Sequence, residues 1–173
     1  MPAGRFTFDE ERSCVWVDGR WSLRAIHTET RGLRGWVEAK PKPDGSLDLT
    51  APVTGSLEVT VDRLSSGNQL YDRELKRRID ARHHPVILGQ ITRVSGTPNP
   101  GHYLVQGDLS FHGRTRTFEH EMSIVLHDPN TISLTGSYIF DLREFNMKPP
   151  SMLMLKVYPE VAVRVELHGT TDG

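Results

Sequence analysis

Residues 107–126, GDLSFHGRTRTFEHEMSIVL, alternate apolar and polar side chains, break the pattern at His112 and Gly113, and then resume it. Alternation with a period of two places every second side chain on the same face of a β-strand. A short break that contains glycine is typical of the turn between two such strands. The stretch therefore predicts an antiparallel hairpin with one apolar face, formed by residues 102–113 and 118–126.

Other segments of the chain show the same alternation. Short strands are predicted at residues 14–19, 46–53, 55–64, 131–140 and 157–169. Residues that turn a chain, mainly Pro, Gly, Asn, Asp and Ser, gather between the strands at 40–46, 95–101, 127–130 and 148–151. Successive antiparallel strands with turns at this spacing predict an all-β barrel or sandwich.

One segment follows a helical period instead. Tyr71, Leu75 and Ile79 recur every four residues, and either Ser66 or Asn68 can cap the start. We therefore expect one short helix at about residues 69–80.

The composition bounds the fold and the partners. The chain has 173 residues, 36% hydrophobic and 25% charged, which predicts a single domain over residues 1–173. A formal net charge of −1 provides no basic field for nucleic acid, so no nucleic-acid partner is expected. One cysteine excludes an internal disulfide. No run approaches the ~20 apolar residues of a membrane-spanning helix, and residues 1–19 lack the apolar run of a signal peptide, so we expect a cytoplasmic protein.

The apolar faces of the strands point to the interior, which the pattern alone leaves either hollow or filled. The residues placed there are Val59, Val61, Tyr103, Val105, Leu109, Phe111, Phe118, His120, Met122, Ile124, Leu134, Tyr138, Phe140, Val161, Val163 and Val165.

Four segments, in order along the chain, resemble a known family. They are LSSGNQLYDRELKRRIDARHHPVIL (64–88), YLVQGDLSFHGRTRTFEHEM (103–122), FDLREFNM (140–147) and EVAVRVELHG (160–169). The matching residues are Gly67, Asn68, Asp72, Leu75, Pro85, Gly107, Leu109, His112, Gly113, Thr115, Arg143 and Phe145. Through them the chain resembles the YceI-like, polyisoprenoid-binding proteins over about residues 53–167.

The resemblance implies a closed antiparallel eight-stranded lipocalin-like barrel whose lumen binds a long apolar isoprenoid lipid without catalysis. Each buried methylene contributes ~0.8 kcal/mol, so a polyprenyl or quinone tail can bind with few polar contacts. A diphosphate or quinone head group would then meet cations at the mouth, for which Arg73, Arg77 and Arg143 are the candidates. No cofactor is expected apart from such a lipid.

Two alternatives remain open from the residues. Eight histidines allow a metal-assisted enzyme, although no HxH or HxxxH motif occurs and only the hairpin limbs could bring His112 near His120. A barrel with a filled core would serve a structural or interaction role instead. The Met-rich segment 147–155 is a candidate for a portal loop, a loop folded on the core, or the contact of a homodimer.

Overall fold

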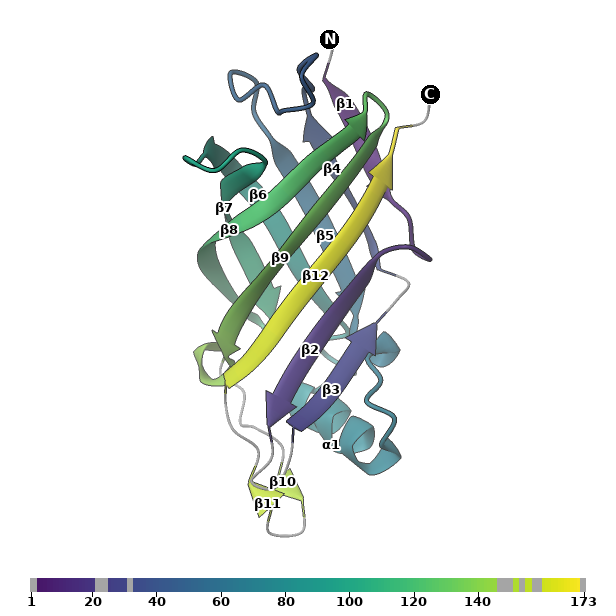
Figure 1. Ribbon diagram of the computed structural model, residues 1–173. Coiled ribbons are helices and arrows are strands. Elements are labelled where there is room, and N and C mark those ends of the chain that lie inside the picture. The colour runs from purple at the N-terminus through teal and green to yellow at the C-terminus, as the bar shows by residue number, and fades with distance from the viewer. Residues whose placement is uncertain are drawn as a thin grey trace.

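The computed structural model describes residues 3–20, 25–30, 33–145, 151–152, 155–156 and 160–171. The strands and helices described are β1 (Gly4–Phe8), β2 (Cys14–Arg20), β3 (Ala25–Thr30), β4 (Arg34–Ala39), β5 (Thr54–Thr60), the 3-10 helix η1 (Val61–Arg63), α1 (Gln69–Ile79), β6 (Val86–Gly96), β7 (His102–Phe111), β8 (Arg114–Asp128), β9 (Thr131–Asp141), the 3-10 helix η2 (Leu142–Phe145), β10 (Ser151–Met152), β11 (Leu155–Lys156) and β12 (Glu160–Thr170). Figure 1 shows the strands wound around one axis, with both termini at the same end.

Eight of these strands close into an antiparallel barrel. The order is β1-β4-β5-β6-β7-β8-β9-β12, and β1 pairs back to β12 through Thr7 with Thr170 and Phe8 with Gly169. Closure removes the free edges that an open sheet would expose. The predicted eight-stranded barrel with one short helix is confirmed.

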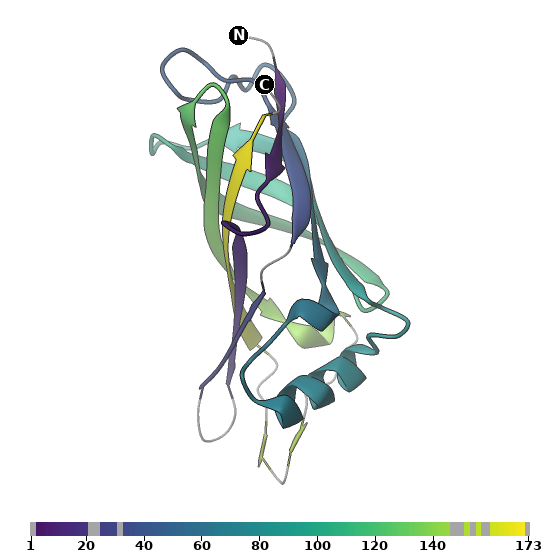
Figure 2. The same cartoon turned by 90° about the vertical axis from the view of Figure 1, so that its right-hand side faces the viewer.

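The strand β12 has two partners on one edge. Near the termini it pairs with β1, whereas residues 162–166 pair with β2, which in turn pairs with β3. The main chain of Glu29 in β3 exchanges hydrogen bonds with Ser65, at 3.0 and 3.1 Å. In Figures 1 and 2, α1 lies beside the hairpin formed by β2 and β3, at the barrel end opposite the termini.

Local polar contacts set the start of α1. Asn68 is the N-cap, and its side chain accepts a hydrogen bond from the Tyr71 N–H at 3.0 Å. Ser66, the other predicted cap, instead donates from its hydroxyl to Asp72 at 2.6 Å. The helix ends at Ile79, and the C-cap Asp80 adopts the left-handed conformation that ends many helices. The side chains of Leu75 and Ile79 lie outside the described part of the structure.

The predicted hairpin is formed by β7 and β8, which pair from His102 with Ser123 down to Phe111 with Arg114. Its turn consists of two residues with positive φ, His112 at 53° and Gly113 at 75°. This is the backbone of a type I′ turn, whose twist matches that of the flanking strands.

The predicted strand at 46–53 is wrong. The segment forms turns, in which Asp44 accepts hydrogen bonds from the N–H and hydroxyl of Ser46, and Asp48 does the same for Thr50. Such hydrogen bonds between an Asp side chain and the backbone two residues later compete with the backbone hydrogen bonds of a β-sheet.

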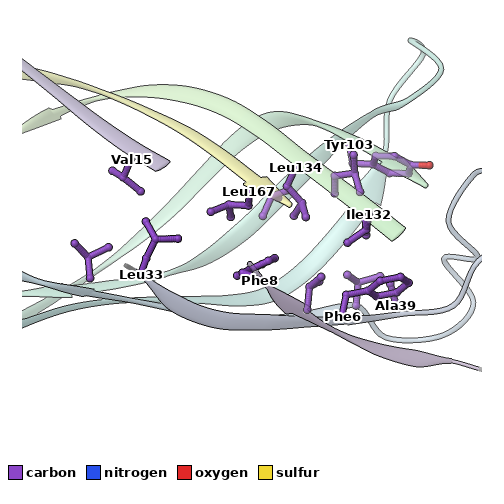
Figure 3. Close-up of a cluster of buried hydrophobic side chains, with 14 of the residues drawn as sticks. Phe6, Phe8, Val15, Leu33, Ala39, Tyr103, Ile132, Leu134 and Leu167 are labelled. Atoms are coloured by element: carbon purple, nitrogen blue, oxygen red, sulfur yellow. The ribbon is translucent and has the colours of Figure 1, made fainter. Parts of the chain in front are cut away.

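The barrel interior differs between its two ends. Toward the termini it is filled by fully or almost fully buried side chains, shown in part in Figure 3. They include Phe6, Val37, Ala39, Leu47, Val53, Leu126 and Ile132. The other end contains the cavity that is the candidate site.

Candidate functional site

A partly enclosed cavity of about 260 Å³ occupies the barrel at the end next to α1. Every barrel strand contributes to its wall, together with β2, β3, α1 and η2. The lining residues are Phe8, Val15, Val17, Thr28, Trp36, Ser56, Leu57, Val59, Leu64, Tyr71, Ile87, Gly89, Gln90, Ile91, Val105, Leu109, Phe111, Phe118, His120, Met122, Leu134, Gly136, Ser137, Tyr138, Phe140, Leu142, Phe145, Val161, Val163, Val165 and Leu167. An apolar lining with few polar groups is typical of sites for apolar ligands.

Most of the residues that the strand pattern assigned to the interior lie in the cavity wall. Of the predicted lumen residues, those in the cavity wall are Val59, Val105, Leu109, Phe111, Phe118, His120, Met122, Leu134, Tyr138, Phe140, Val161, Val163 and Val165. They come from β5, β7, β8, β9 and β12, so the period of two brings residues from five strands to one space.

Three predicted lumen residues lie elsewhere, and these placements are corrected. Tyr103 and Ile124 are buried at the filled end, where the Tyr103 hydroxyl accepts a hydrogen bond from the Leu47 N–H at 3.1 Å. Val61 is buried but belongs to η1, because its carbonyl accepts a hydrogen bond from the Leu64 N–H at 3.1 Å, and its own N–H donates to the Pro85 carbonyl at 2.9 Å. None of the three lines the cavity.

Aromatic rings form one continuous side of the cavity. His120 and Tyr138 meet edge to face with centroids 5.1 Å apart, and Tyr138 lies 4.4 Å from Phe140. Phe145 makes edge contacts with Phe140 at 6.3 Å and with Phe111 at 5.7 Å. These separations fall within the favourable range for aromatic pairs or, for Tyr138 and Phe140, at its lower edge, so the rings give this side of the cavity a defined shape.

The hairpin turn holds part of this aromatic side in place. The Nδ1 atom of His112 lies 3.1 Å from the Phe145 carbonyl oxygen, a hydrogen bond that joins the turn to η2. Phe145 is 2% exposed and lines the cavity. The partner of His112 is 33 residues away in the chain. The turn therefore fixes a segment that covers the cavity.

The three predicted head-group arginines lie on the elements beside the cavity, Arg73 and Arg77 in α1 and Arg143 in η2. None of them lines it. Arg77 donates to Glu74 at 3.1 and 2.8 Å, and Arg143 donates to Asp141 at 3.0 and 2.6 Å. Two of the three guanidinium groups are therefore engaged in exposed ion pairs.

Polar side chains that could suggest catalysis lie on the outer wall. The Ser133 hydroxyl is 2.7 Å from Nε2 of His127 and 3.1 Å from Nδ1 of His168, whose Nε2 is 3.0 Å from Glu166. Ser133 faces outward, because its neighbours Ile132 and Leu134 point inward and are fully buried. No member of this set lines the cavity.

The residues described contain no group of three or more His, Cys, Asp or Glu side chains that could hold a metal ion. His112 lies at the hairpin turn, whereas His120 pairs with Val105 further along β8. The hairpin therefore separates the two histidines rather than joining them.

The profile of the YceI-like domain matches residues 6–169. The chain belongs to the YceI-like family. A comparison with curated proteins finds no match.

Solved structures share the fold of this YceI-like chain. Burkholderia cenocepacia BcnA has a TM-score of 0.78 at 16% identity, with 94% of this chain and 99% of that chain covered. A polyisoprenoid-binding domain from Saccharophagus degradans, implicated in plant cell wall breakdown, has a TM-score of 0.72 at 8% identity, with 96% and 98% covered. The Campylobacter jejuni YceI protein has a TM-score of 0.66 at 10% identity, with 86% of each chain covered.

Several lining residues of the YceI-like barrel were not among those predicted. Val15 and Val17 alternate within β2, and Phe8 alternates with Phe6 in β1, so a period of two was present in both short strands. Tyr71 carries no such signal, because the helical pattern alone does not show that α1 covers the cavity.

Burial raises the pKa of Tyr71 to about 12, and the negative charge of Asp72 adds to the effect. In the unfolded chain the Tyr71 hydroxyl ionises near pH 10, so between pH 10 and 12 it loses its proton only in the unfolded state. As the pH rises from 10 to 12, the free energy of unfolding of the wild type should therefore fall by roughly 2–3 kcal/mol more than that of Tyr71→Phe. Urea unfolding of both proteins from pH 9 to 12 measures the difference. If the free energies of unfolding of the two proteins changed with pH in parallel, the raised pKa of Tyr71 would be contradicted.

The Met-rich segment of this YceI-like chain lies largely outside the described residues. Ser151 to Met152 and Leu155 to Lys156 form the paired strands β10 and β11, with backbone alone described for the methionine. Among the helices that the structure describes, none has the length and apolar character needed to cross a membrane.

Proposed function

We propose that the chain binds the apolar tail of an isoprenoid lipid, such as a polyprenyl or quinone lipid, inside the barrel and without catalysis. The observation that carries this proposal is the apolar cavity enclosed by all eight barrel strands. The family supports it at the level of a lipid-binding barrel, and one structural neighbour is itself described as a polyisoprenoid-binding domain.

The lining favours a ligand that needs few polar partners. Removing apolar surface from water stabilises a complex by ~25 cal/mol per Å², without any directional contact. Branched side chains such as Val59, Val161 and Val163 present methyl groups to the cavity, and the aromatic side supplies flat surfaces. Methyl-branched isoprene units complement both kinds of surface through van der Waals contact.

The polar head of the lipid would remain near α1 and η2. Arg73, Arg77 and Arg143 are proposed to contact it, because guanidinium groups bind phosphate in a bidentate manner. Arg77 and Arg143 already pair with Glu74 and Asp141, so an anionic head would compete with those carboxylates. We therefore expect the tail to contribute more to the affinity than the head.

The test is extraction of the purified protein with organic solvent, followed by mass spectrometry of the extract and by uptake of an added prenyl probe with a dansyl head group. We expect an isoprenoid lipid in the extract and saturable uptake by the emptied protein, with about one probe per chain. An extract without isoprenoid, together with no uptake of the probe, would contradict the proposal.

A further inference from the structure

We propose that the cavity is a blind pocket that accepts a tail of about three isoprene units and stops longer tails at an internal floor. This inference rests on the proposed function and specifies the class of lipid. The floor consists of Phe8, Leu134 and Leu167, which line the cavity and also belong to the buried core. Their exposed fractions are 5%, 0% and 5%.

The interior beyond the floor is packed too tightly for a tail to pass. Gly169 pairs with Ile132 and with Phe8. These pairs lie two residues closer to the termini than the pair formed by Leu134 and Leu167. A Cβ atom added at Gly169 would lie 3.2 Å from both Ile132 and Phe6 and 3.3 Å from Phe8. Because close-packed cores leave no continuous space, this layer closes the barrel.

Figure 3 shows the arrangement of these layers. Leu134 and Leu167 lie across from Phe8, and Phe6, Ala39 and Ile132 follow in the direction of Tyr103. Phe6, Ala39 and Ile132 are at most 1% exposed and none lines the cavity. The lumen is therefore hollow on one side of the floor and filled on the other.

The strand register gives the depth of the pocket. From the pair of Leu134 and Leu167 to the pair of Phe140 and Val161 there are six residues along both strands. At about 3.3 Å per residue this is about 20 Å of strand, or about 15 Å along the axis of a barrel whose strands tilt by about 40°. On β7, which is separated from β9 by β8, the lining from Val105 to Phe111 spans the same number of residues.

An isoprene unit contributes four bonds of about 1.5 Å to the chain and advances it by about 5 Å when extended. A depth of about 15 Å therefore holds about three units. The cavity volume of about 260 Å³ agrees, because it lies just below the range of about 300–1,000 Å³ found for drug-sized ligands. A polyprenyl lipid could insert only its first or last few units, and the remainder would stay outside.

The test compares geranyl, farnesyl and geranylgeranyl probes that carry the same dansyl head group, each below its aggregation concentration. From geranyl to farnesyl we expect the dissociation constant to fall at least about tenfold, since the added unit is buried. From farnesyl to geranylgeranyl we expect a change of less than about threefold, since the added unit stays in water. A continued steep fall would overturn the inference and leave the proposed function standing.

A variant at the floor locates the limit. Leu134→Ala should deepen the pocket, so that geranylgeranyl binds about tenfold more tightly than farnesyl. Ile139→Ala is the matched control, because it shortens an apolar side chain on the same strand that is 68% exposed on the outer wall. Ile139→Ala should retain the wild-type dependence of the dissociation constant on chain length. If a folded Leu134→Ala protein kept the wild-type dependence of affinity on chain length, the assignment of the floor would be overturned. If the wild-type protein bound none of the probes, the proposed function itself would be overturned.

Discussion

Val163→Trp should reduce uptake of a farnesyl probe by about a hundredfold. Val163 lines the cavity from β12, between Tyr138 on β9 and Val17 on β2. An indole at this position occupies the space of several methylenes of the ligand. Because each buried methylene contributes ~0.8 kcal/mol, excluding four of them costs about 3 kcal/mol. Fluorescence titration measures the change in the dissociation constant.

Ala162→Trp is the matched control for this result. Ala162 is adjacent in β12 and exposed, so the same ring would lie on the outer wall beside Ile139. Uptake should stay within about twofold of the wild type, because surface changes away from a site have small effects. Circular dichroism must show the same strand content in both variants, since overpacking can also unfold a protein. Equal uptake by two folded variants would place the ligand outside the barrel.

Gly107→Ala should destabilise the fold by about 3 kcal/mol or more, a large share of the stability of a typical domain. A Cβ atom at Gly107 would overlap the Gln90 carbonyl oxygen and lie 2.8 Å from the ring of Phe118. Neither group can move freely, because Gln90 is held in the β6 ladder and Phe118 lines the cavity. The free energy of unfolding in urea measures the effect.

Gly89→Ala is the control for Gly107→Ala. Gly89 lies in the neighbouring strand β6 and lines the cavity, but its added Cβ would meet only the Leu57 carbonyl oxygen, at 3.9 Å. We expect a change of less than about 1 kcal/mol, or slight stabilisation, since alanine loses less conformational entropy than glycine on folding. Equal stability of the two variants would show that close approach at Gly107 does not limit the barrel.

The β7–β8 hairpin was predictable because its signals agree. Alternation over both limbs and glycine at Gly113 specify strands and a tight turn, and the structure adds the positive φ of His112. The strand β6 gave no such alternation, since a register shift between Ile91 and Arg93 interrupts its pattern. The short strands β1 and β4 were likewise missed: the alternation of Phe6 and Phe8 covers only five residues, and in β4 the adjacent apolar residues Trp36 and Val37 interrupt the period of two.

The composition of the wall was predictable, but the extent of the cavity was not. Alternation assigns Val105 and Tyr103 to the same interior face, although Val105 lines the cavity and Tyr103 lies in the filled end. Whether an inward side chain meets a void or a neighbour depends on which strands cross at that level. That information lies in long-range pairings such as Phe8 with Gly169, which no local pattern contains.

Methyl NMR of the protein saturated with farnesol tests the central claim most directly, that an apolar tail occupies the hollow end of the barrel. The account predicts intermolecular nuclear Overhauser effects between the ligand and methyl groups of Val59, Leu109 and Val163, with none to Leu47 in the filled end. Contacts confined to outward methyl groups such as those of Val125 and Ile139 would contradict it, as would the absence of any contact with the cavity wall.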